Sequence, residues 1–449
     1  TVYNISTVGV SNEKLIDSTL WVLHDWSGSL SLTNEEIDAE RGVIREEWRT
    51  RRTSGFRLKM QTDPVLYKGS KYSKRDVIGD LNIINNFKYP ELRNYYKKWY
   101  RPDLQAVIIV GDIDVKKMEE KVKAIFSGIP LAKKAAPRTY FEIPKHDELY
   151  FGTASDKEAS STTITLQYVL DEPLVKDSIL SRKNVMNSFY TSILNNRFKE
   201  LILKNQSAAL GLKTYFEPIS RLNTSFNISA AGKKGKTLEA FEDALTEAER
   251  LKRFGIAQAE LDRTKKLFIS SYDDFLSNKD KVDNDSWADK VTNYFLKAKP
   301  FLSAEDDYKL IVGIIKNITL EEINTYIKTI QKPTNQVVLV TGSDEDKVNF
   351  PTKDAVVQVM KKVENKTLEP YTKKENNEPL IAKELKPAAI KKTFEIPGIT
   401  AAKGYTLENG ANVIVLPTTY SQDQVVLTAF SKGGKSLINT EDLASAVIA

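Results

Sequence analysis

Residues 33–52 of the chain read TNEEIDAERGVIREEWRTRR, and this stretch predicts one helix. Thr33 or Asn34 can cap its start, because a side-chain oxygen at that position accepts a free backbone N–H. Glutamates occupy the first turn and arginines the last turn, and the helix dipole favours charges of these signs at these two ends. A buried stripe is predicted by apolar side chains that recur with the helical period, at Ile37, Val43 and Ile44.

Two acidic side chains lie close to this predicted stripe. Glu40 and Glu47 are two turns apart on one face of the helix. A carboxylate beside an apolar face is costly unless a cation or a hydrogen-bond donor meets it. Taken alone, the stretch favours a simpler interpretation, a solvated helix whose acids pair with arginines.

The composition is that of an ordinary globular protein with enough chain for two or three domains. Of the 449 residues, 41% are hydrophobic and 28% are charged. The net charge of +6 is dispersed, which disfavours a nucleic-acid-binding module. We expect no membrane span, because no apolar run reaches the length of about 18 residues that one needs. Cysteine is absent, which excludes disulfides and a thiol nucleophile.

Histidine is scarce as well, since only His24 and His146 occur. A zinc site usually needs more nitrogen or sulfur ligands than this chain can gather in one place. The sequence starts at Thr1 within a predicted strand and stops at Ala449 within an apolar helical pattern. We therefore expect it to be a piece of a longer protein.

Mixed apolar periodicities predict an α+β protein. Strands are predicted at residues 1–8, 105–112, 162–170, 209–216, 222–231 and 336–342. Helices are predicted at 11–26, 33–52, 90–99, 115–127 and 176–204, and over most of 237–328. Near the C-terminus we expect a hairpin with its turn at Asn409–Gly410, a strand at 424–434 and a helix from Thr440.

Changes in composition suggest where the domains begin and end. Residues 1–135 are predicted to be the C-terminal part of a first α/β unit, followed by a proline-rich linker at 136–147. A second α/β unit is predicted at 148–345. Residues 346–400 are rich in Lys, Glu, Asn and Pro, which predicts a loosely packed linker. Residues 401–449 would start a third unit.

An internal repeat indicates two copies of one α/β unit. Three blocks align in the same order at nearly one spacing: TVYNIS (1–6) with TSFNIS (224–229), EIDAERGVIREE (36–47) with ELDRTKKLFISS (260–271), and ELRNYYKKWYRPDLQAVIIVGD (91–112) with EINTYIKTIQKPTNQVVLVTGS (322–343). Chance is an unlikely explanation for this agreement. By this alignment, the first copy lacks its N-terminal part in this sequence.

The repeat also separates structural from functional positions in the helix at 33–52. Glu40 aligns with Thr264 and Glu47 aligns with Ser271, whereas the three apolar positions stay apolar. The fold therefore needs the stripe but not the acids. A carboxylate pair that is present in one copy only favours a cation site in that copy.

These segments resemble the pitrilysin/insulinase family of zinc metallopeptidases, the inverzincins. The resemblance is carried by ERGVIREE (40–47) and by KYSKRDVIGDLNIINNFKYPELRNYYKKWYRPDLQAVIIVGDID (71–114). Weaker matches are LNNRFKELI (194–202), GYTLENGANVIVLP (404–417) and AFSKGG (429–434). The resemblance implies half of a clam shell, built from tandem α/β units that each hold a mostly antiparallel sheet covered by helices.

The resemblance further implies a zinc site. In the family, H-x-x-E-H on a helix of the first unit supplies two zinc-binding histidines and a glutamate that acts as general base. This motif is absent from the sequence and is expected upstream of Thr1, so no catalytic residue is assigned within the chain. Glu47 is implied as the third zinc ligand. Glu40 is implied to orient a ligating histidine without touching the metal.

The expected function is that of a zinc endopeptidase, with the chain as an inactive fragment of it. The expected partners are a peptide or unfolded segment as substrate, and the remaining half of the same protein or a partner subunit around an enclosed chamber. Nucleic acid is not expected. The composition would suit a bacterial periplasm or cell envelope. The alternative is a non-catalytic family member that serves as a structural or peptide-binding subunit.

Overall fold

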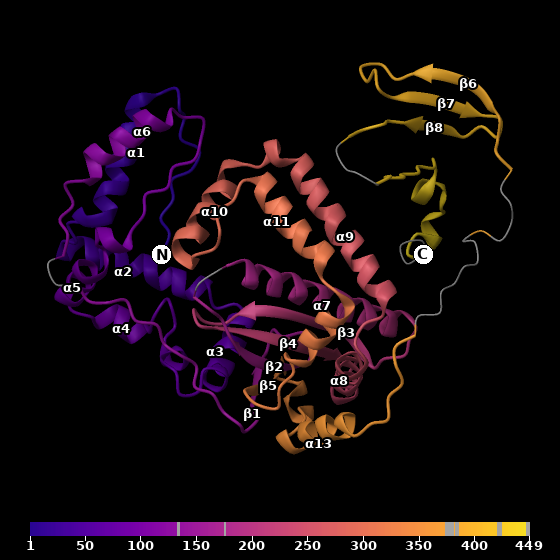
Figure 1. Cartoon of the computed structure of the whole chain (residues 1–449), viewed down its shortest axis with the longest axis horizontal. Helices are drawn as coiled ribbons and strands as arrows, with labels where there is room; N and C mark the ends of the chain where they lie inside the picture. Colours follow the sequence, from indigo (N-terminus) through magenta and orange to yellow (C-terminus); the bar gives the residue numbers. More distant parts are fainter. Residues whose placement is uncertain (133–134, 175–176, 373–380, 382–385, 420–423, 446–449) are drawn as a thin grey trace. The chain divides into compact units, whose positions relative to one another are not determined.

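The computed structural model describes residues 1–132, 135–174, 177–372, 381, 386–419 and 424–445 (Figure 1). The chain divides into two compact units. The larger unit comprises residues 1–269 and 281–376, and the smaller comprises residues 270–280 and 377–449. The domain boundaries expected from the sequence stay a prediction.

The N-terminal part of the larger unit is helical where the structure describes regular elements. Its α-helices are α1 (Glu13–His24), α2 (Asn34–Thr50), α3 (Ser54–Leu66), α4 (Leu81–Asn86), α5 (Tyr89–Trp99) and α6 (Val115–Phe126). The helices expected in this part of the chain are confirmed. The sequence did not predict α3 and α4, which start where Thr53 and Asp80 cap free backbone N–H groups.

The strands predicted at 1–8 and 105–112 are wrong, since neither segment forms a hydrogen-bonded strand. Their counterparts in the second copy belong to β4 (Asn223–Gly232) and β5 (Gln336–Ser343), which both pair with β2 (Thr163–Asp171). In the first copy, the described residues contain no strand that could take the place of β2. A strand forms only when a partner meets its backbone groups, so the two segments stay unpaired here.

A mixed sheet occupies the centre of the second copy. Besides β2, β4 and β5 it contains β1 (Tyr150–Asp156) and β3 (Ala209–Pro218). The strand order is β1-β5-β2-β4-β3, in which β1 and β5 run parallel and the other neighbours antiparallel. β2 is central, because Leu166 lies opposite Val338 of β5 on one side and Ile228 of β4 on the other.

One face of this sheet carries helices from its own copy. The helices of this region are α7 (Ser178–Leu203), α8 (Thr237–Phe254), α9 (Gln258–Ser277), α10 (Asn284–Lys297), α11 (Ala304–Asn317) and α12 (Leu320–Lys328). α7 and α8 lie against β3 and β4. Tyr190 of α7 stacks on Phe226 of β4 with ring centroids 4.9 Å apart. Both side chains are fully buried, so the main core lies between these helices and the sheet.

The other face of the sheet meets α3 from the first copy. Leu66 and Tyr67 at the end of α3 form a buried cluster with Val337 and Leu339 of β5. These β5 residues alternate with Val338, so they point away from α7. The first copy is therefore packed on the sheet of the second.

The segment after β5 is more ordered than its composition predicts. Residues 353–364, expected to lie in a loose linker, form α13 (Lys353–Glu364), which packs against α8. Val356 and Val363 of α13 are buried. Arg253 of α8 donates hydrogen bonds to the carbonyls of Val363, Glu364 and Lys366. Val356, Val359 and Val363 lie on one helical face and outweigh the polar composition here, so this stretch is not the loosely packed segment that its composition predicts.

The smaller unit contains an antiparallel three-stranded sheet. Its strands are β6 (Ile390–Glu395), β7 (Lys403–Leu407) and β8 (Asn412–Val415), in that order. The hairpin predicted around Asn409–Gly410 is confirmed, and Gly410 adopts a φ of 86° that its missing Cβ permits. Residues 424–434 form no strand, so that prediction is wrong. A short 3₁₀ turn, Thr440–Asp442, stands where the helix was expected to begin, and residues 446–449 of that prediction lie outside the described residues.

Candidate functional site

The helix at the centre of the sequence argument is α2, and its start is held by a capping box. Thr33 accepts the Glu36 backbone N–H, and the Glu36 carboxylate accepts the Thr33 backbone N–H at 3.0 Å. The Ser31 hydroxyl donates to the same carboxylate at 2.7 Å. The Ser31 hydrogen bond, together with those from Thr33, holds the pKa of the Glu36 carboxyl below its usual range. The predicted helix is therefore confirmed, with bounds that differ by at most two residues.

The predicted apolar stripe of α2 is only partly buried. Ile37 is buried, but Val43 is 57% exposed and Ile44 is half-buried. Beneath the helix, Arg41 donates to the Phe87 carbonyl at 2.8 Å and stacks on the Phe87 ring. The prediction fails at Val43 because no part of the described chain covers that side of α2.

The two predicted site residues lie on this uncovered side. Glu40 is exposed, and Glu47 is half-buried. One Glu47 oxygen pairs with the Arg51 guanidinium at 2.6 Å, across one turn. The next residue back, Glu46, pairs with Arg49 at 2.9 Å. Glu47 thus makes a local pair of the kind that a solvated helix makes, on a face that remains open to a partner.

The chain does not assemble a metal site from its own described residues. Among them, no three His, Cys, Asp or Glu side chains gather closely enough to hold an ion. His24 contacts the Asp25 carboxylate at 3.1 Å. His146 hydrogen-bonds the Glu148 carbonyl and stacks on Tyr150. Glu47 has the donor chemistry of a zinc ligand, but it can contribute only one ligand to a site that other residues complete.

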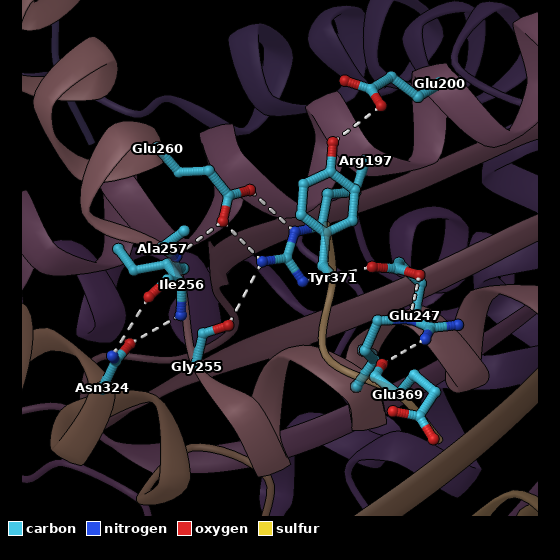
Figure 2. A network of polar contacts seen from close by, with 12 residues as sticks. Arg197, Glu200, Glu247, Gly255, Ile256, Ala257, Glu260, Asn324, Glu369 and Tyr371 are labelled. Atoms are coloured by element: carbon cyan, nitrogen blue, oxygen red, sulfur yellow. Dashed lines mark hydrogen bonds and ion pairs between the residues drawn. The ribbon is translucent and has the colours of Figure 1, made fainter. Parts of the chain in front are cut away.

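Sequence reasoning missed a buried ionic network in the second copy, which Figure 2 shows around Arg197 of α7. The guanidinium is 2% exposed and donates to both oxygens of Glu260, at 2.9 and 2.7 Å. It also reaches a Glu247 oxygen and the Gly255 carbonyl, both at 3.3 Å. The Tyr371 ring lies 4.2 Å from the guanidinium carbon. Nothing in the spacing of the sequence signals these pairings, because the partners are distant along the chain.

This network has a structural role that the repeat explains. Glu260 caps α9 by accepting the Ala257 backbone N–H at 2.9 Å. The alignment pairs Glu260 with Glu36 and Ala257 with Thr33, so the same cap starts α2 in the first copy. Because all of these carboxylates are engaged by donors of the fold, we assign the Arg197 network to stability rather than to catalysis.

A groove of about 270 Å³ runs between α7 and the edge strand β3. It is lined by Asn187, Ser188, Thr191, Asn195, Thr214, Tyr215 and Phe216. Asn195 donates to the Thr214 carbonyl at 2.9 Å and accepts the Thr214 N–H at 2.8 Å. The side chain thus satisfies the edge of the sheet at this residue, as a neighbouring strand would.

Comparison with known proteins points to one family. The sequence model of the "Peptidase M16 inactive domain" matches residues 86–268. The chain is 24% identical over 453 residues to the "Zinc protease PQQL-like" of Arabidopsis thaliana, covering 99% of the chain and 44% of that protein. It is 25% identical over 442 residues to the "Probable zinc protease PqqL" of Escherichia coli, covering 97% of the chain and 46% of that protein. The chain thus spans about half the length of these curated relatives.

Solved structures share the fold. The crystal structure of the periplasmic protease PqqL from Escherichia coli matches 92% of this chain and 46% of its own, with a TM-score of 0.76 and 23% identity. Pitrilysin matches 85% of this chain and 41% of its own, with a TM-score of 0.55 and 14% identity. These findings make the chain similar to the M16 peptidases, the pitrilysin/insulinase family, over most of its length.

Proposed function

We propose that this chain is part of a zinc endopeptidase in which Glu47 is a metal ligand. The remaining ligands and the general base would come from an H-x-x-E-H helix outside the 449 residues. The proposal is supported by the uncovered face of α2 that carries Glu47. In the second copy, α7 covers the equivalent face of α9. There, Phe189 of α7 packs on Phe268 of α9 with ring centroids 5.1 Å apart. Phe268 aligns with Ile44, one turn before Glu47.

The chemistry assigned to this chain is limited to its own residues. Zinc, when bound, polarises a scissile carbonyl and lowers the pKa of its water to about 7. Glu47 would supply one carboxylate ligand after exchanging its Arg51 partner for the metal. Glu40, two turns earlier on the same face, would hold a ligating histidine in its productive orientation.

The proposed substrate is a peptide or an unfolded segment, cleaved in a chamber that the chain encloses with the remaining half of the protein or with a partner subunit. Several relatives are named zinc proteases, which supports the proteolytic activity. In the part of the chain that the structure describes, no helix combines the length and the apolar character that a bilayer span requires. We place the protein in a bacterial cell envelope, because the Escherichia coli relative is described as periplasmic.

A Glu47→Gln variant of the full-length protein tests the proposal. We expect the bound zinc and the cleavage of an unstructured peptide to be lost together, because an amide is a poor zinc ligand. Metal content is measured by atomic emission and cleavage by a quenched fluorescent peptide. Glu46→Gln is the matched control, since Glu46 pairs with Arg49 beside the site. Full zinc content in the Glu47→Gln variant would remove Glu47 from the ligand set.

A second candidate, a non-catalytic subunit, is favoured by one observation: the matching family model is that of the inactive domain. For this candidate, the full-length wild-type protein would bind no zinc, and the Glu47→Gln change would alter neither metal content nor peptide cleavage. The same measurement therefore separates the two functions.

A further inference from the structure

We propose that Tyr95 is a positioning residue of the zinc site, whose hydroxyl hydrogen-bonds the helix that carries the other ligands and fixes that helix against α5. This inference rests on the proposed function. The observations behind it lie in the second copy of the repeat, where Tyr326, the counterpart of Tyr95, contacts the helix α7.

The helices α5 and α12 are structural equivalents. Residues 89–97 align with the whole of α12, and at the start of both helices a glutamate accepts the backbone N–H three residues earlier, Glu91 from Lys88 and Glu322 from Thr319. The buried side chain of Tyr96 corresponds to that of Ile327. Tyr95 therefore occupies the same position on α5 that Tyr326 occupies on α12.

In the second copy this tyrosine anchors α7. The Tyr326 hydroxyl donates to the Asn187 side-chain oxygen at 2.5 Å. One turn earlier on α12, Glu322 accepts two hydrogen bonds from Arg182 of α7, at 2.5 and 2.6 Å. Burial raises the pKa of the Tyr326 hydroxyl. α12 therefore sets both the position and the rotation of α7.

The helix that carries the tyrosine is attached to its neighbour in the same place in both copies. Arg93 of α5 donates to the Leu32 carbonyl ahead of α2 at 2.9 Å. At the aligned positions, Asn324 of α12 accepts the Ile256 N–H ahead of α9 at 2.8 Å. Since α5 is fixed to α2 as α12 is fixed to α9, Tyr95 faces the place that a counterpart of α7 would fill. Its side chain is 59% exposed in this chain.

Tyr95 and Glu47 would meet the same stretch of that incoming helix. In the second copy, the Tyr326 hydroxyl binds Asn187 of α7. Asn187 is two positions from Phe189, which packs on Phe268 of α9, the residue that aligns with Ile44. A hydrogen bond from Tyr95 would thus control the rotation of the helix next to Glu47. Ligand orientation is sensitive to such contacts, whose loss typically costs 10–100-fold in metal affinity.

The test compares Tyr95→Phe with Tyr326→Phe in the full-length protein. Zinc affinity is measured by chelator competition, and ligand geometry by the visible spectrum of the cobalt(II)-substituted protein. We expect Tyr95→Phe to weaken zinc binding about 10–100-fold and to change the cobalt spectrum. Tyr326→Phe should lower the melting temperature and leave both metal readouts unchanged. It removes the equivalent hydrogen bond from the second copy, in which Thr264 and Ser271 replace Glu40 and Glu47.

The outcomes separate this inference from the proposed function. If Tyr95→Phe lowers only the melting temperature while Glu47→Gln abolishes zinc binding, the positioning role is overturned and the zinc site stands. If Glu47→Gln retains zinc at full affinity, the proposed function fails, and the positioning role fails with it. Tyr89→Phe, which removes a hydrogen bond from α5 to Asp38 of α2, controls for general loosening of α5.

Discussion

Arg197 shows how much one side chain can matter when it is buried between charges. The Arg197 guanidinium is the cation that compensates Glu260 and reaches Glu247, and all three side chains are almost fully buried. A buried carboxylate that loses its partner carries an uncompensated desolvation cost. The residue therefore stabilises the junction of α7, α8 and α9.

At this scale we predict that Arg197→Met lowers the free energy of unfolding by about 3–5 kcal/mol, measured by urea denaturation. Arg182→Met is the matched control, because Arg182 also makes a two-point pair, with Glu322, but both side chains are about one-third exposed. Its loss should cost about 1 kcal/mol or less. Equal losses in the two variants would contradict the assignment of a buried, essential cation.

At the scale of elements, the packing of α3 on β1 joins the two copies. Arg57 of α3 donates to both oxygens of Asp156 on β1, at 2.5 and 2.7 Å. The Gln61 amide adds a hydrogen bond to the Ser155 carbonyl at 2.9 Å. The Arg57 hydrogen bonds hold the pKa of the Asp156 carboxyl well below its usual range.

This contact predicts an acid-sensitive interface. An Asp pKa that is lower in the folded state stabilises the fold above its unfolded value of about 3.9, and this contribution is lost as pH falls towards the folded pKa. We expect Asp156→Asn to reduce stability at pH 7 and to flatten the decline of stability below pH 4, followed by circular dichroism. Asp171→Asn should do neither, because its pair with Lys145 is about 70% exposed on both sides.

At the scale of the whole molecule, the two copies differ in how completely they are paired. Residues 336–343 lie between two strands, whereas the aligned residues 105–112 lie in no sheet. Amide protons exchange slowly only where the backbone is hydrogen-bonded and closed to water.

Hydrogen–deuterium exchange of this 449-residue chain should therefore protect residues 336–343 and leave 105–112 to exchange at least tenfold faster. Peptides covering residues 1–8 should behave like 105–112, while those covering 223–232 in β4 provide the paired reference. Strong protection of 105–112 in the isolated chain would show that this segment has found a strand partner and would contradict the structure.

The elements that could be predicted are those specified by neighbours in the sequence. The α2 cap uses Thr33 and Glu36, three residues apart, and the β7–β8 hairpin uses Asn409–Gly410 at its turn. The repeat was equally visible, because aligned positions need only similar side chains. Glu40 and Glu47 were found by the same comparison, and their roles stay predictions.

The sequence by itself determined the α+β class, the repeat and the helix that bears the acids, because short-range periodicity and capping encode all three. Only the tertiary structure decided that residues 1–8 and 105–112 remain unpaired, that Val43 is exposed and that α13 packs against α8. It also decided that Arg197 neutralises Glu260, 63 residues away. Strand pairing, burial and charge compensation depend on what lies opposite a residue in space, and the local sequence does not specify that partner.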